Sequence, residues 1–249
     1  MRRRRRGGVT LIELLIAVTL VGLLTMGILF AMRVGLGAMD AVDRKFAGGR
    51  RVVGAQRVLD QQIAGLIPVQ IQCGGPRDVP ALFFQGERNA MRFVSSYTLE
   101  EGMRGYPRVV EYLVMPGEQG VGVRLLMNEY IYTGPSTIVP LCMGTAMDNR
   151  TRTMSVRLRP VGMGPRPFVI ADKLAGCRFS YLLSDGRLAR QAWTGQFAGS
   201  IPPLAIRIEM VPLTPDPSRM QMASVTVPVR VNRNAMAYYF DIDPPQPAQ

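Results

Sequence analysis

Residue types that perform acid–base, nucleophilic or metal chemistry are sparse and scattered in this chain. It contains no histidine, which excludes Ser-His-Asp and Cys-His catalytic sites. Its carboxylates match neither a zinc-protease helix nor an EF-hand loop, and the run 117–122 lacks the glycine spacing of a nucleotide-binding loop. Asp241 and Asp243, in a proline-rich tail, are weak evidence for a calcium site. We therefore expect no enzyme, no metal site and no cofactor.

One carboxylate, Glu13, occupies an unusual position. It is the only charged residue between Val9 and Met32, a run without proline, asparagine or glutamine. A helix rises about 1.5 Å per residue, so about 20 apolar residues cross a bilayer core, and this run predicts a membrane-spanning helix. A carboxylate in such a helix costs about 2.5 kcal/mol or more unless it has a partner. No other residue of the helix can pair with it, so the partner is expected from another molecule.

Five consecutive arginines, Arg2 to Arg6, precede this apolar run. The positive-inside rule places that end in the cytoplasm and the residues from 33 onward on the far side of the membrane.

The stretch Gly8-Val9-Thr10-Leu11-Ile12-Glu13-Leu14 resembles the type III signal of type IV pilins and type II secretion pseudopilins. The resemblance implies that a prepilin peptidase cuts after Gly8 and that the new N-terminus, Val9, is N-methylated. It also implies that Glu13 meets the N-terminal amine of a neighbouring subunit during assembly. Val9 departs from the phenylalanine usual in the family, although other apolar residues occur there.

Three other interpretations of the N-terminus are weaker. A secretory signal could be cut after the small residues of 35–38, but its apolar core would be shorter and would lack Glu13. A plain membrane anchor explains the arginines and the length but not Glu13. A twin-arginine signal matches less well still.

Periodicity divides the remainder of the chain. Apolar residues recur at three and four positions from Val42 to Leu66, which predicts an amphipathic continuation of the helix packed on a sheet and ended by Pro68. From Val69 the period is two, with glycine and proline punctuation. The predicted hairpins pair 81–85 with 91–95, 109–115 with 122–127, 177–183 with 187–193, and 204–211 with 223–231. Separate strands are expected at 153–159 and 167–171, and Pro228 predicts an edge strand or a bulge.

The predicted fold class is α+β and pilin-like, with a long N-terminal helix, its first half transmembrane, packed on antiparallel β-sheets. The predicted parts are a leader peptide at 1–8, a transmembrane and filament-core helix at 9–32, the amphipathic half of the same helix at 33–67, a periplasmic β-rich domain at 68–243 and a disordered tail at 244–249.

The three cysteines form no C-x-x-C pair, so zinc and redox motifs lack support. Cys73 and Cys142 both lie in turn-rich stretches, whereas Cys177 lies in a strand-like one. We favour a disulfide between Cys73 and Cys142, which an extracytoplasmic location permits, with Cys177 buried and reduced. Three unpaired thiols are the alternative.

The formal charge of +12 includes the five leader arginines, and cleavage leaves 25 basic against 18 acidic residues. These positive charges are spread singly along the chain, unlike the clustered stripe of a nucleic-acid-binding surface. We expect no nucleic-acid partner.

Further resemblance lies in the strand-like half. Arg108–Leu113, Cys177–Tyr181 and Pro202–Ile208, with Trp193 between the last two, resemble stretches of J-type minor pseudopilins. The last strand, Val225–Arg233, also resembles that of W-type minor type IV pilins. The first resemblance implies a minor, non-enzymatic tip or initiation subunit of a type II secretion pseudopilus, in the bacterial inner membrane. Its implied partners are I-like and K-like pseudopilins, other major and minor pseudopilins, the prepilin peptidase and the inner-membrane assembly platform. The alternative is a minor type IV pilin serving pilus assembly, adhesion or DNA uptake.

The motif predicts the mature N-terminus. Mass spectrometry of the protein from its native membrane should find a chain that begins at Val9 and carries one methyl group. Gly8→Ala retains a small side chain and should be cut partly, whereas a bulky residue at this position should block cleavage. An intact Met1, or a start at Met39, would contradict the prediction.

Overall fold

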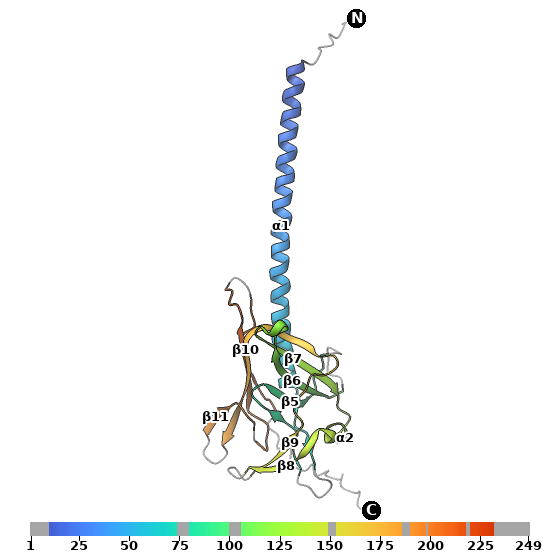
Figure 1. Cartoon of the computed structure of the whole chain (residues 1–249), viewed down its shortest axis with the longest axis vertical. Coiled ribbons are helices and arrows are strands. Elements are labelled where there is room, and N and C mark those ends of the chain that lie inside the picture. The colour runs from blue at the N-terminus through green and yellow to red at the C-terminus, as the bar shows by residue number, and fades with distance from the viewer. Residues whose placement is uncertain are drawn as a thin grey trace, which may run out of the picture. The chain divides into compact units, whose positions relative to one another are not determined.

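The computed structural model describes residues 10–73, 80–99, 106–148, 153–185, 190–197, 199–217 and 220–231. The chain divides into two compact units, Met1–Arg50 and Arg51–Gln249, called here the helical unit and the sheet unit. The predicted α+β class, with an apolar N-terminal helix followed by an antiparallel sheet domain, is confirmed (Figure 1). The predicted tail at 244–249 and the pair Asp241 and Asp243 lie outside the described residues.

Helix α1 covers Leu11–Ala64, 54 residues without proline. Within it, Leu11–Met39 is long and apolar enough to cross a membrane. Every side chain of this stretch is exposed, so no described residue covers its apolar surface.

The amphipathic part of α1 crosses the boundary between the two units. Within the sheet unit, Val53 is 51% exposed, whereas Leu59 and Ile63 near the helix end are fully buried in the core. The predicted packing of the stripe on a sheet is therefore confirmed at the helix end. A helical period identifies the apolar face, but it does not show which turns of that face are fully buried.

The end of α1 is closed by hydrogen bonds from strand β5, which covers Ala90–Ser95, and from the next residue. Ser95 Oγ donates to the carbonyl of Gln62 at 2.8 Å, and the Ser96 N–H donates to the carbonyl of Gly65 at 2.8 Å. A Cβ on Gly65 would lie 3.0 Å from both serine hydroxyls, so the close approach of helix and strand favours glycine there. These contacts provide partners for carbonyls that a helix end leaves unpaired.

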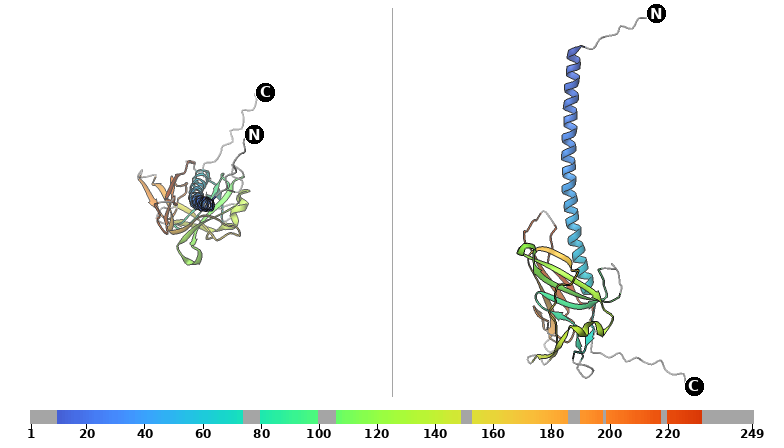
Figure 2. Two further views of the ribbon diagram at one scale, coloured as in Figure 1. Left: turned by 90° about the horizontal axis from the view of Figure 1, so that it is seen from above. Right: turned by 45° about the vertical axis from the view of Figure 1, so that its right-hand side comes forward.

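The main sheet contains nine antiparallel strands in the order β1-β5-β6-β7-β10-β12-β13, with β4 paired to β5 and β11 paired to β10. Two smaller sheets are β2-β3 and β8-β9. With β5, the strands are β1 Leu66–Ile67, β2 Gln70–Ile71, β3 Ala81–Leu82, β4 Gln85–Gly86, β6 Arg108–Pro116, β7 Val123–Ile131, β8 Cys142–Asp148, β9 Thr153–Leu158, β10 Phe168–Asp185, β11 Arg190–Thr194, β12 Ala205–Pro212 and β13 Val225–Pro228. The short helices are η1 Glu118–Gly120, α2 Pro135–Ile138 and η2 Val139–Leu141. Helix α2 lies with β8 and β9 at one end of the sheet unit (Figures 1 and 2).

Three of the predicted hairpins are confirmed: β6–β7, β10–β11 and β12–β13. Strand β13 ends the sheet order, as predicted from Pro228. The remaining hairpin differs, because β5 pairs with β4 while β3 pairs with β2.

Strand β10 corrects a further prediction. Its 18 residues join two strands that were expected to be separate, at 167–171 and 177–183. Its first part, up to Leu174, pairs with β7, its last part from Tyr181 pairs with β11, and β12 pairs along the other side from Leu174 to Leu182. Bulges between Val169 and Leu174 interrupt the register with β7. Pairing with three different strands therefore makes β10 one long strand, although its local sequence pattern changes along its length.

One buried polar contact joins α1 to the sheet. Gln62 and Tyr112 are fully buried, and the Tyr112 hydroxyl donates to Gln62 Oε1. Gln62 Nε2 has no hydrogen-bond partner among the described residues. Apolar neighbours surround the pair, including Leu59, Ile63 and Phe93. The contact therefore fixes how the helix end sits on the sheet.

Removing the Tyr112 hydroxyl should leave both polar atoms of the Gln62 amide unpaired. We expect Tyr112→Phe to lower the unfolding free energy by about 1–3 kcal/mol, and Tyr112→Phe with Gln62→Leu to recover part of that loss. Thermal unfolding of the full chain in detergent measures both. Tyr106→Phe, at a 75% exposed position, is the control and should change little. A double variant whose loss equals the sum of the single losses would contradict this interpretation.

Candidate functional site

The N-terminal motif continues into the first turn of α1. Thr10 precedes the helix; its carbonyl accepts from the Glu13 N–H at 3.1 Å and the Leu14 N–H at 3.2 Å. Thr10 Oγ1 also accepts from the Glu13 N–H, at 3.4 Å. Thr10 is thus the N-cap, and Thr-x-x-Glu is the spacing of a capping box. Gly8 and Val9, the predicted cleavage and methylation sites, lie outside the described residues.

Glu13 has a local structural role that the sequence analysis missed. A negative side chain in the first turn of a helix is favoured by the helix dipole, by about 0.3–1 kcal/mol at exposed sites. The Thr-x-x-Glu spacing is the signal that could have revealed it. This small gain does not offset the cost of placing a carboxylate in hydrocarbon, so the helix start alone does not account for Glu13.

The side chains next to Glu13 on the helix are apolar. Its neighbours on the helix, Leu11, Ile12, Leu14 and Leu15, are all more than half exposed. Among the described residues no ion pair involves Glu13; those given by the structure lie in the sheet unit, between Arg92 and Glu111, Arg124 and Glu118, and Glu209 with Arg178 and Arg207. What the site offers is one carboxylate on an exposed apolar helix.

The cysteines lie in two separate places. Cys73 and Cys142 form a disulfide with a Cα–Cα distance of 5.5 Å, the pairing favoured from the sequence. It ties the segment after α1 to the first residue of β8. Cys177 in β10 is free, as expected, but only half-buried rather than buried. Burial raises the pKa of its thiol to about 12.

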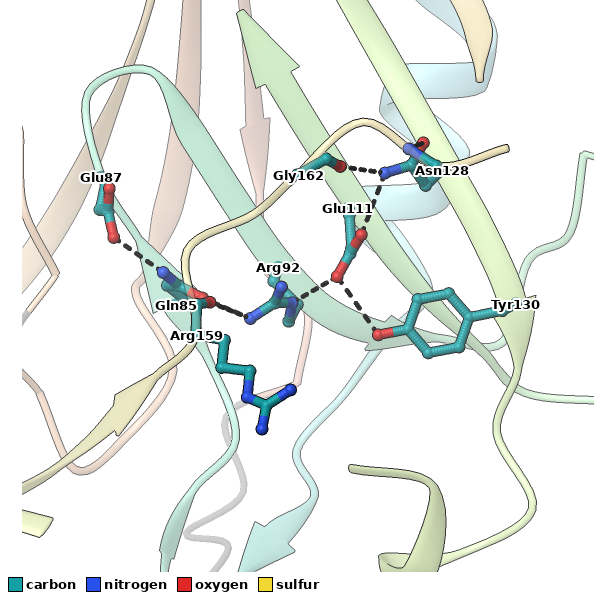
Figure 3. Close-up of polar contacts among 9 residues, drawn as sticks. Gln85, Glu87, Arg92, Glu111, Asn128, Tyr130, Arg159 and Gly162 are labelled. Atoms are coloured by element: carbon teal, nitrogen blue, oxygen red, sulfur yellow. Dashed lines mark hydrogen bonds and ion pairs between the residues drawn. The ribbon is translucent and has the colours of Figure 1, made fainter. Parts of the chain in front are cut away.

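A second polar group, called here the polar row, crosses the main sheet on the face opposite α1. Gln85, Arg92, Glu111 and Asn128 stand directly opposite one another on β4, β5, β6 and β7 (Figure 3). Arg92 Nε donates to Glu111 Oε1 at 2.6 Å, and Arg92 Nη1 donates to Gln85 Oε1 at 2.7 Å. Asn128 Nδ2 donates to Glu111 Oε2 at 3.0 Å.

The ion pair at the centre of this row is almost completely buried. The side chains of Arg92 and Glu111 are 2% and 9% exposed. Tyr130 also donates to Glu111 Oε1, at 3.2 Å, and its pKa is raised by burial and by that carboxylate, so the hydroxyl stays a donor. The row was not predicted from the sequence. Its signal is a charged residue in the interior of each of two largely apolar strands, Arg92 in β5 and Glu111 in β6.

The described residues contain no group of three or more His, Cys, Asp or Glu side chains placed to hold a metal. An apolar recess of about 540 Å³ in the sheet unit is lined by α1 residues 51–58, the start of β10, Leu99 and Met222. Neither this recess nor the polar row brings a nucleophile next to a base. The distinguishing feature of the chain is the N-terminal motif followed by an apolar helix of membrane length.

Comparison with known proteins agrees with this. The family described as the prokaryotic N-terminal methylation motif matches residues 3–29. No curated protein matches the chain. The motif, with the membrane-length apolar helix and the sheet domain behind it, supports the type IV pilin and pseudopilin superfamily, whose members are membrane-anchored structural subunits that assemble with one another after prepilin peptidase processing.

The cysteine arrangement predicts a stepwise pattern of thiol labelling. At pH 8 the unreduced full chain in detergent should label slowly, because the raised pKa of Cys177 keeps its thiol protonated and burial hides it. After denaturation one thiol should label, and after denaturation with reduction three should. Cys177→Ser should remove the single thiol that labels after denaturation without reduction. Three thiols labelled without reduction would contradict the disulfide.

Proposed function

We propose that this protein is a minor pseudopilin of a type II secretion system, a tip or initiation subunit of the pseudopilus that takes part in protein export. The observation that carries the proposal is Glu13 on an exposed apolar helix, inside a matched methylation motif and ahead of a separate sheet domain. Cleavage after Gly8 and methylation of Val9 would give the mature subunit, held in the inner membrane with the sheet unit in the periplasm.

The choice of a J-like subunit rests on the stretches that resemble that type. Arg108–Leu113 forms most of β6, Cys177–Tyr181 lies within β10, and Pro202–Ile208 leads into β12. The last two are neighbours in the sheet, with Phe179 opposite Ile208. I-like and K-like subunits are the partners that this assignment proposes.

A minor type IV pilin serving pilus assembly, adhesion or DNA uptake is the second candidate. The observation that favours it is the last strand, β13, in the stretch that resembles W-type minor pilins. Deleting the gene separates the two functions. Loss of protein export with intact pili supports the secretion role, whereas loss of pili with normal export supports the second candidate. Genomic neighbours give the same distinction.

Pairing of Glu13 with an amine is the proposed assembly contact. Desolvation disfavours a lone carboxylate in hydrocarbon, and cleavage creates a cation at similar depth on a neighbouring subunit, the amine of its first residue. Bringing the two together in a dry filament offsets two burial penalties, although the net gain is small. The pair therefore acts mainly as a register device, which admits a subunit at one axial offset.

Glu13→Ala should leave cleavage, membrane insertion and folding of the sheet unit intact, yet reduce incorporation beside filament neighbours. In-cell crosslinking through a photoreactive residue at Leu20, exposed on the same helix, measures incorporation. Thr25→Ala is the control, because the Thr25 hydroxyl bonds only to carbonyls of its own helix, Val21 and Gly22. Glu13→Gln should be nearly as impaired if charge is required. Normal crosslinking and normal export with Glu13→Ala would remove the assembly role.

A further inference from the structure

The hairpin β8–β9, called here the arm, does not pair with the strands of the main sheet, although Leu158 packs in one apolar cluster with Val94 and Val109 of that sheet. Its two strands pair only with each other in the sheet assignment of the described residues. The register runs from Asp148 opposite Thr153 to Cys142 opposite Leu158, so the arm has its root at Cys142 and Leu158. The root is where its position relative to the main sheet must be fixed.

A short connection, the strap at 159–164, leads from the end of β9 toward β10 and is bound by side chains of the polar row. Arg92 Nη1 donates to the carbonyl of Arg159 at 2.8 Å. Asn128 Nδ2 donates to the carbonyl of Gly162 at 2.8 Å (Figure 3). Asn128 Oδ1 accepts from the Gly164 N–H at 3.1 Å. Side chains of the polar row therefore bond to main-chain groups of the strap that are not paired with a strand.

The strap also fits closely on the sheet beneath it. Val161 is buried against Ala90 and Leu113. A Cβ on Gly164 would lie 2.7 Å from Asn128 Oδ1. The strap therefore approaches Asn128 closely only because residue 164 is glycine. Arg92 in turn is fixed by Glu111, since a buried guanidinium is strongly disfavoured without its carboxylate. The row is thus a rigid support shaped for this one connection.

The two strands of the arm are therefore fastened separately at the root. Strand β8 begins at Cys142, which is bonded to Cys73. Strand β9 ends at Leu158, directly before the Arg159 carbonyl held by Arg92. Besides the pairing of β8 with β9, a main-chain hydrogen bond from the Arg159 N–H to the Leu141 carbonyl at 2.8 Å connects the two sides at the root.

We propose that the polar row is a latch and the arm a separately opening part of the sheet unit. The disulfide and the latch hold the two sides of the root, so either one keeps the arm docked when the other is released. Loss of both frees the arm while the main sheet stays folded. The device is redox-dependent, because the disulfide is the fastening that a reductant removes and the latch is the one that remains. It does not rest on the filament role proposed above.

Hydrogen exchange of the full chain in detergent, with and without reductant, tests this device. Asn128→Ala removes two strap contacts at a half-buried position. In the reduced protein it should raise exchange in β8 and β9 by about tenfold or more, since buried polar groups lose their partners. Exchange in β6 and β12 should stay within about twofold. In the oxidised protein the same variant should change the arm much less.

Tyr130→Phe is the matched control, because Tyr130 bonds to Glu111 in the same row and no described bond joins its hydroxyl to the strap. It should leave arm exchange unchanged in both redox states. Arg92→Met combined with Glu111→Gln removes the Arg92 contact to the Arg159 carbonyl without leaving a buried charge, and after reduction it should raise arm exchange as Asn128→Ala does. Arm exchange unchanged in both variants after reduction overturns the proposal. So does an equal rise in β6 and β12, which would make the row a support of the whole core.

Discussion

The apolar surface of Leu11–Met39 is the constraint on which the rest of the structure depends. Removing apolar surface from water gains about 25 cal/mol per Å², yet no described residue covers this stretch. The length and composition of this stretch suit a membrane or neighbouring helices, whereas the sheet unit buries its own core around Phe93, Tyr112 and Phe179. The chain therefore combines an apolar helix with a sheet unit that has its own core. Glu13 is the carboxylate that interrupts the apolar surface of the helix.

Local patterns predicted the parts of this fold that local physics determines. The length of α1 follows from an uninterrupted run without proline, and the hairpins β6–β7, β10–β11 and β12–β13 follow from alternating strands close in sequence. The N-terminal motif was readable because its residues are consecutive. Even there one local signal was missed, the Thr-x-x-Glu spacing in which the Thr10 hydroxyl caps the helix.

The remaining features depend on contacts between distant parts of the chain. The 18-residue length of β10 results from three partner strands, none of which its own sequence specifies. Arg92, Glu111 and Asn128 form one row only because β5, β6 and β7 pair in one register, and a shift of one residue would turn each side chain to the other face. Which turns of α1 are fully buried, those of Leu59 and Ile63, is likewise set by the sheet.

Glu13 and Glu111 are two carboxylates in apolar surroundings, and they differ in their bonding partners. Glu111 receives hydrogen bonds from Arg92, Asn128 and Tyr130, so its charge is compensated within the sheet unit. Glu13 receives no ion pair from any described residue. A buried charge that is already paired stabilises one conformation, whereas an unpaired one gives an incoming cation a reason to bind at one place. The contrast agrees with the proposal that Glu13, unlike Glu111, completes its contact with a neighbouring subunit.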